Sequence, residues 1–157
     1  MHNAFYAASF QYQRAEFLHQ ALHPGSDSEH SAQIQKLIQR RSDEILAGLL
    51  FSEHADLPVD GVDGSAEFQN DFLAGALPSK EGWSLRDLRL QKRLFKYRCS
   101  YTIHSKSFGH LPAPIKRRVL ANLRQHLTAD PIAGMPVLSE RERTRIHAIL
   151  TETLDAY

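Results

Sequence analysis

Two of the nine histidines stand at a spacing that helical metal sites use. His19 and His23 are four residues apart, so both imidazoles could face one divalent metal ion. The pair needs a third ligand, for which Glu29 and His30 are the nearest candidates, and no Glu directly follows His19 as a metalloprotease pattern requires. A haem or metal held by histidines would use His19, His23 and His104. The alternative, which we prefer, is two surface histidines near a helix C-terminus, where the helix dipole favours a protonated ring.

The single cysteine, Cys99, has a histidine nearby at His104, an arrangement that could supply a nucleophilic thiolate. The two residues are five apart, and on a continuous helix they would point about 140° away from each other. We therefore interpret Cys99 as a small core residue beside Phe95 and Ile103, because free cysteines are usually buried. One cysteine also excludes an internal disulfide and a Cys-rich metal site.

Charge is separated along the chain. The overall formal charge is only +1, but residues 1–83 carry five basic and twelve acidic side chains, a net −7. Residues 84–126 carry eleven basic side chains and one acidic side chain, a net +10, and residues 127–157 have a net −2. Such asymmetry indicates either an anionic partner or packing of oppositely charged surfaces.

The basic stretch contains a candidate binding face. On a helix from Leu85 to Phe108, four basic residues would fall within an arc of about 80°: Arg86, Arg89, Arg93 and Lys96. This face could receive phosphates of a nucleic acid or a lipid surface. It could instead pack against the acidic N-terminal third, within one chain or across a dimer. We prefer packing and do not expect a nucleic-acid partner, because nucleic-acid-binding domains are usually strongly basic overall.

Other catalytic or ligand-binding motifs are incomplete. The stretch Gly61–Gly64 lacks the Lys and Ser or Thr that follow the glycines of a phosphate-binding loop. Asp56, Asp60 and Asp63 share one loop but lack the spacing of a calcium-binding EF-hand, so we interpret them as solvated. No cofactor is expected, with haem or a divalent metal as the alternative.

Apolar residues recur at helical spacing through most of the chain. The first predicted helix spans residues 3–22, and the second carries Ile34 to Leu50 with Ser28 or Ser31 as its cap. A short helix capped by Ser65 and the helix from Leu85 to Phe108 follow. The last two are a helix with Pro114 in its first turn and a helix that begins with a capping-box pattern at Ser139 and Glu142. Alternation of apolar and polar residues, which would indicate strands, is not sustained. We predict an all-α fold, a single-domain bundle of five or six helices over residues 1–157, either complete or part of a longer chain.

Part of this sequence resembles a known group of proteins. The stretches Trp83–Leu88 and Arg93–Tyr101, followed by Phe108 and Leu111-Pro112, are similar to the C-terminal region of a group of large, exported, uncharacterised bacterial proteins with the pattern SLRDxxL, RLFxYxCSY and ALP. The resemblance covers about residues 45–157. The group has Pro where this chain has Arg98 and Tyr where it has His104, so the resemblance implies two helices rather than one in this region. It assigns no catalytic residue and implies a periplasmic location.

These observations favour a protein that works by association rather than catalysis. We expect a non-enzymatic helical domain whose partner is another protein or a second copy of itself. A haem- or metal-binding bundle is the alternative, and nucleic-acid binding comes third. No membrane span is expected, because the longest apolar run, Ile45–Phe51, is far shorter than about 20 residues. Residues 1–10 lack the basic start of a secretory signal, so the sequence as written indicates either the cytoplasm or a mature chain or fragment whose signal was removed.

Overall fold

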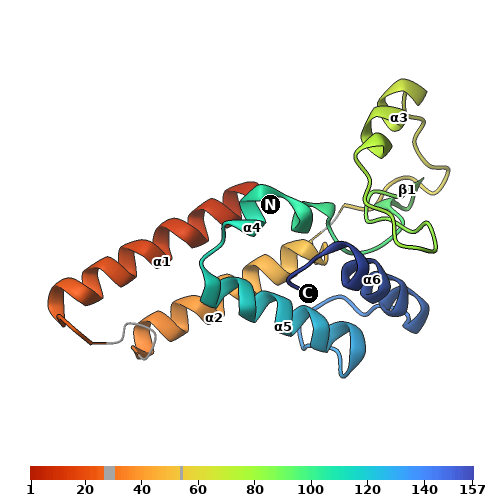
Figure 1. Cartoon of the computed structure of the whole chain (residues 1–157). Helices are drawn as coiled ribbons and strands as arrows, with labels where there is room; N and C mark the ends of the chain where they lie inside the picture. Colours follow the sequence, from red (N-terminus) through yellow and green to blue (C-terminus); the bar gives the residue numbers. More distant parts are fainter. Residues whose placement is uncertain (27–30, 54) are drawn as a thin grey trace.

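The computed structural model describes residues 1–26, 31–53 and 55–157, and long helices make up most of it (Figure 1). α1 (His2–Leu22) and α2 (Ala32–Leu49) run antiparallel and pack side by side. The first two predicted helices are therefore confirmed. Ser31 is the N-cap residue of α2, without a side-chain hydrogen bond, whereas Ser28 lies outside the described residues.

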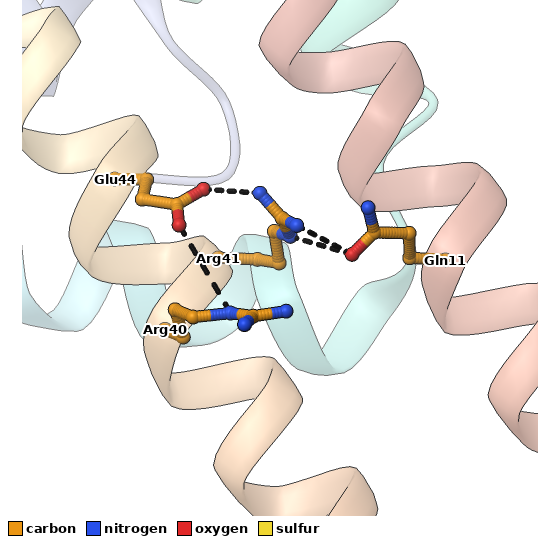
Figure 2. Close-up of polar contacts among 4 residues, drawn as sticks. All are labelled: Gln11, Arg40, Arg41 and Glu44. Atoms are coloured by element: carbon orange, nitrogen blue, oxygen red, sulfur yellow. Dashed lines mark hydrogen bonds and ion pairs between the residues drawn. The ribbon is translucent and has the colours of Figure 1, made fainter.

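A polar contact fixes α1 against α2 (Figure 2). Arg41 of α2 donates hydrogen bonds from Nε, at 2.9 Å, and from Nη2 to the side-chain oxygen of Gln11 on α1. Nη1 of Arg41 pairs with Glu44 one turn further along α2. Glu44 also lies 4.0 Å from Nε of Arg40. Arg41 therefore links the polar edges of α1 and α2, next to the buried apolar face of α1.

The core lies between α2 and the last two long helices. α5 (Ala113–Thr128) packs against α2, and α6 (Glu140–Thr153) packs against α5. Apolar residues three or four positions apart give each helix one buried face. The fully buried core includes Ile45, Leu46, Leu49, Ile115, Val119, Leu123, Ile146 and Ile149. Burying such a side chain contributes about 1.5–3 kcal/mol.

Three predicted helix starts are confirmed. Ser65 is the N-cap residue of α3 (Ala66–Ala74), and its hydroxyl accepts a hydrogen bond from the amide of Phe68. Pro114 lies in the first turn of α5, where its missing N–H costs nothing. Ser139 caps α6 by accepting from the amide of Glu142 at 3.2 Å. Serine side chains thus satisfy amides that the first turns of α3 and α6 leave without a helical partner.

The single helix predicted from Leu85 to Phe108 is wrong, and the two helices that the resemblance implies are not found either. The segment instead contains a short antiparallel hairpin, a 3-10 helix and one turn of α-helix: β1 (Leu88–Gln91), β2 (Arg93–Phe95), η2 (Tyr101–His104) and α4 (Lys106–Gly109). Leu88 pairs with Phe95, and Gln91 pairs with Arg93.

Contacts from a distant loop favour the hairpin over the helix. The amide of Leu57 donates to the carbonyl of Lys92 at 2.8 Å, and the amide of Val62 donates to that of Leu90 at 2.9 Å. Leu90 and Lys92 have φ angles of 59° and 60°, in the left-handed region, which a right-handed helix cannot contain. This conformation costs roughly 1–2 kcal/mol per residue. Hydrogen bonds between residues about thirty positions apart offset that cost. The spacing of apolar residues within the segment does not predict these hydrogen bonds.

α3 and the hairpin lie together at one side of the long helices, at the upper right of Figure 1. No residue of α3 is fully buried. Its main contacts come from Phe72, whose ring centroid is 5.2 Å from that of Tyr101 and 6.0 Å from that of Phe95. The attachment of α3 therefore rests on a small aromatic cluster, away from the core between α2 and α5.

The predicted fold class is confirmed. The described residues form six α-helices in a single-domain bundle, and the hairpin is a small addition to it. In the part of the chain that the structure describes, no helix has both the length and the apolar composition needed to cross a membrane.

Candidate functional site

Arg86 and His104, two residues singled out from the sequence, line one cavity of about 320 Å³. On the predicted helix they would have been about 27 Å apart. The hairpin returns the chain instead, so that the segment before β1 meets η2. The segment that follows α3 closes another wall with Gly75 and Leu77, and His2 of α1 also lines the cavity. Sequence reasoning does not find these last three residues, because nothing in their local sequence indicates the contact.

The guanidinium group of Arg86 is held between two aromatic rings. Its central carbon lies 5.0 Å from the ring centroid of Phe72 and 4.9 Å from that of Tyr101, within the range of cation–π attraction. Nη1 donates a 2.8 Å hydrogen bond to the carbonyl of Phe72. Among the described residues, no carboxylate pairs with Arg86, and neither Nε nor Nη2 has a protein acceptor.

Gly75 lets the chain pass close to this guanidinium group. A Cβ atom at position 75 would lie 2.6 Å from Nη1 of Arg86 and 2.9 Å from its central carbon. Both distances are below van der Waals contact, so any other residue would displace Arg86. The backbone at Gly75 therefore lies directly against the guanidinium group.

His104 is neutral and has a defined tautomer. Burial lowers its pKa, and the positive charge of Arg86 lowers the pKa further. Nε2 lies 2.9 Å from the hydroxyl oxygen of Thr153, whose own proton goes to the carbonyl of Ile149 at 2.6 Å. Thr153 must therefore accept, so Nε2 of His104 carries the proton and Nδ1 is bare. Arg86 is the only arginine or lysine among the described residues that line the cavity.

Hydroxyl groups complete the polar part of the lining. Ser84 accepts from the amide of Arg86 at 3.1 Å, and Ser105 accepts from the amide of Phe108 at 3.2 Å. The hydroxyl protons of both serines have no acceptor among the described residues. Leu77, Leu85 and the ring of Tyr101 supply apolar surface. The cavity therefore combines one fixed cation, free hydroxyl donors and apolar walls, and none of its described lining residues is acidic.

The other three residues of the predicted basic face do not line the cavity that contains Arg86. Arg89 is exposed on β1, and Nη1 of Arg93 forms a 2.9 Å ion pair with Glu142 of α6. Lys96 lies 3.5 Å from the carboxylate of Asp87. Since the segment is not helical, the helix face that would unite these four residues does not exist. Within one chain, the acidic partners of Arg93 and Lys96 lie outside the N-terminal third, whereas packing against that third across a dimer stays a prediction.

His19 and His23 are close, as their spacing predicts. Their ring centroids are 5.1 Å apart, and Nε2 of His19 lies 2.9 Å from the hydroxyl of Ser26. Among residues 1–26, 31–53 and 55–157, no three His, Cys, Asp or Glu side chains are arranged to hold a metal ion. The proposed third ligands, Glu29 and His30, lie outside the described residues. His104 is far from this pair, because its cavity contains His2, about 25 Å from His19 along α1.

Cys99 is a core residue. Its side chain is fully buried, and burial raises the pKa of its thiol to about 12. The thiol is therefore protonated at physiological pH and is a poor nucleophile. This placement agrees with the core interpretation, although Cys99 lies after the hairpin rather than on a helix.

A face of α1 that the sequence analysis does not single out is exposed and aromatic. The side chains of Tyr6, Phe10 and Phe17 are 65%, 65% and 72% exposed. The buried side of α1 is formed by Phe5, Ala8 and Tyr12. Leu18 and Leu22, further along α1, are exposed as well. The aromatic face was readable from the sequence, because residues 6, 10 and 17 have helical spacing.

Comparisons of the chain with protein-family models, with curated proteins and with solved structures gave no match.

Proposed function

We propose that this chain is a non-enzymatic helical module that associates with a second copy of itself through the aromatic face of α1, defined as Tyr6, Phe10 and Phe17. The observation that carries the proposal is the exposure of three large aromatic side chains on one side of one helix. Scattered apolar residues are normal on protein surfaces, but a contiguous apolar patch marks an interaction site. Aromatic residues also dominate the energetics of protein interfaces.

The aromatic face is directed away from the core. At 100° per residue, its three members fall within an arc of about 40°, centred about 150° from the buried side of α1. The contact between Arg41 and Gln11 holds α1 in this orientation (Figure 2). Tyr6 is held in addition by the hydroxyl of Ser107, 3.4 Å from its own. The face is thus presented in a fixed orientation, which reduces the entropy lost on association.

Charge and spacing favour a second copy as the partner. Arg14 and Glu16 are the only acidic or basic residues in α1 apart from its histidines, so two such faces can meet with little electrostatic repulsion. In a two-fold antiparallel pairing, Tyr6 of one copy would face Phe17 of the other, and Phe10 would face Gln13. Two-fold dimers are the commonest protein oligomers, and their interfaces need such a self-complementary surface.

Sedimentation velocity over a range of protein concentrations tests the proposal. We expect the wild-type chain to form a dimer and Phe10→Glu/Phe17→Glu to be a monomer, because two carboxylates would lose hydration at the interface. The matched control is Val59→Glu/Val137→Glu, which adds the same charge at positions 76% and 83% exposed and should remain dimeric. Circular dichroism checks that both variants fold. A wild-type chain that stays monomeric, or a control that dissociates like the α1 variant, would contradict the proposal.

A further inference from the structure

We propose that the cavity at Arg86 is a binding site for a small organic monocarboxylate. The ligand's carboxylate would lie against Nε and Nη2 of Arg86, and its carbon skeleton would lie along Leu77, Leu85 and the ring of Tyr101. This inference is independent of association through the aromatic face, because Tyr6, Phe10 and Phe17 do not line the cavity.

The first argument is the state of the guanidinium group. A half-buried arginine normally pairs with a carboxylate, since desolvating a charge without a partner is costly. Arg86 has two aromatic rings and one carbonyl instead, and the described residues supply no acid to it. Its Nε and Nη2 form one edge of the planar fork, the edge that binds both oxygens of a carboxylate in bidentate pairs. The protein thus uses one edge of the fork and leaves the other for a ligand.

The second argument is preorganisation. The Phe72 and Tyr101 rings lie on the guanidinium carbon, and the Phe72 carbonyl fixes Nη1. The missing side chain at Gly75 lets the backbone approach the same group. An arginine that is already held in one orientation loses little side-chain entropy when it binds an anion. Arg89, which is exposed, has none of these contacts among the described residues.

The third argument concerns the class of anion. Arg86 is the only arginine or lysine in the described lining, and one guanidinium group matches one carboxylate better than a doubly charged phosphate. The hydroxyl groups of Ser84 and Ser105 can donate to the same anion. A volume of about 320 Å³ is at the lower end for small-molecule sites, and the apolar wall suits a short aliphatic chain or one aromatic ring.

Nuclear magnetic resonance titration of the full chain tests the site, with acetate, butanoate and benzoate as probes. We expect saturable shifts of the Arg86 side-chain Nε–H, and tighter binding of butanoate and benzoate than of acetate because of the apolar wall. Benzamide has the shape of benzoate without its charge and should not compete. Inorganic phosphate should bind at least about tenfold more weakly than benzoate, because part of its charge would stay unpaired.

Two variants distinguish bidentate binding by the guanidinium group of Arg86 from attraction by positive charge alone. Arg86→Lys keeps the positive charge but loses the bidentate geometry, and we expect at least about a tenfold loss of affinity for benzoate. Leu77→Trp leaves Arg86 intact and fills the cavity from an exposed position, so it should also abolish binding. It therefore tests the site even if the Arg86 variant does not fold. Arg89→Lys is the matched control and should bind as the wild type does. Absence of saturable carboxylate binding, equal binding of benzamide, tighter binding of phosphate, or equal effects of Arg86→Lys and Arg89→Lys would each overturn the proposal.

Discussion

His126 is a buried histidine on α5 whose two ring nitrogens both have backbone partners. The amide of Ile132 donates to Nδ1 at 3.1 Å, so Nε2 carries the proton and donates to the carbonyl of Pro136, also at 3.1 Å. The neutral ring therefore ties the loop between α5 and α6 to α5. Burial lowers the pKa of His126, the Pro136 carbonyl opposes that shift, and the charge of Arg143 adds to it.

This pKa shift predicts a loss of stability in mild acid. Because the folded-state pKa lies below the unfolded value near 6.5, the unfolded chain takes up the proton first. The contribution of His126 is therefore complete above about pH 6.5 and is lost as the pH falls from there through the folded-state pKa. His126→Gln should lower the free energy of unfolding at neutral pH by about 1–3 kcal/mol and should reduce its decrease toward acid pH.

Urea unfolding at neutral and at mildly acidic pH measures both effects of His126→Gln. Part of the pH dependence should persist in this variant, because burial and Arg86 also lower the pKa of His104. The exposed His110→Gln is the control and should keep the wild-type profile. If His126→Gln and the wild type lost the same stability between the two pH values, the assignment of His126 would be wrong.

Cys99 gives a second prediction for a single side chain. With its pKa raised to about 12 by burial, the thiolate is roughly a thousandfold scarcer than that of an exposed thiol at the same pH. We expect the native chain to react with Ellman's reagent at least about a hundredfold more slowly than the same chain in urea. Equal rates under the two conditions would show that Cys99 is accessible.

Among the elements, α6 and the hairpin are joined by one carboxylate. Oε1 of Glu142 accepts from Nη1 of Arg93 and from the backbone amide of Arg98, both at 2.9 Å. The predicted capping box has Glu142 reach back to the start of its own helix. The Ser139 half of that motif forms, but the carboxylate of Glu142 instead holds the chain after β2 against α6.

Removing this carboxylate should destabilise the contact between α6 and the hairpin. Glu142→Ala leaves the guanidinium of Arg93 and the amide of Arg98 without this partner, so we expect a loss of about 1–3 kcal/mol in the free energy of unfolding. Glu142→Gln keeps an acceptor oxygen and should lose less. Glu140→Ala, in the same turn but exposed, should lose under about 1 kcal/mol. Equal losses for Glu140→Ala and Glu142→Ala in urea unfolding would contradict the role of Glu142.

The difference between the long helices and the hairpin shows what local sequence can predict. α2, α5 and α6 were predictable because each buries a face whose apolar residues repeat every three or four positions, with caps or a proline at the start. The hairpin was not, because it depends on hydrogen bonds from Leu57 and Val62, about thirty residues away. The same error hid the cavity, since Arg86 and His104 meet only when the chain turns back between them.

At the scale of the whole molecule, two basic residues of residues 84–126 find their acidic partners in the second half of the chain. Arg93 and Lys96 belong to the basic stretch, yet their carboxylate partners are Glu142 and Asp87, both after residue 83. Arg41 in the acidic stretch pairs with its own neighbour Glu44. These three basic side chains are therefore paired with carboxylates, whereas Arg86 has no carboxylate partner among the described residues.

The molecule as a whole has a core of long helices and a less tightly held region made of α3 and the hairpin. Proteins open locally where few apolar side chains are buried. α3 buries no residue fully and is attached mainly through Phe72, whereas α2 and α5 contribute much of the core. Native-state hydrogen exchange should therefore show that α3 amides are protected at least about tenfold less than those of α2 and α5.

Two substitutions in α3 distinguish local opening from global unfolding. Phe72→Ala removes the ring that contacts Arg86, Phe95 and Tyr101, so it should accelerate exchange in α3 and leave the protection of α5 nearly unchanged. Phe68→Ala removes a ring of the same size that is 64% exposed and should have a smaller effect on α3. If α3 and α5 amides exchanged in one cooperative step, the aromatic cluster would belong to the same folding unit as the core. Because Phe72 also contacts Arg86, local opening of α3 in the wild-type chain should open the cavity as well. Benzoate bound at Arg86 should then slow the exchange of the α3 amides.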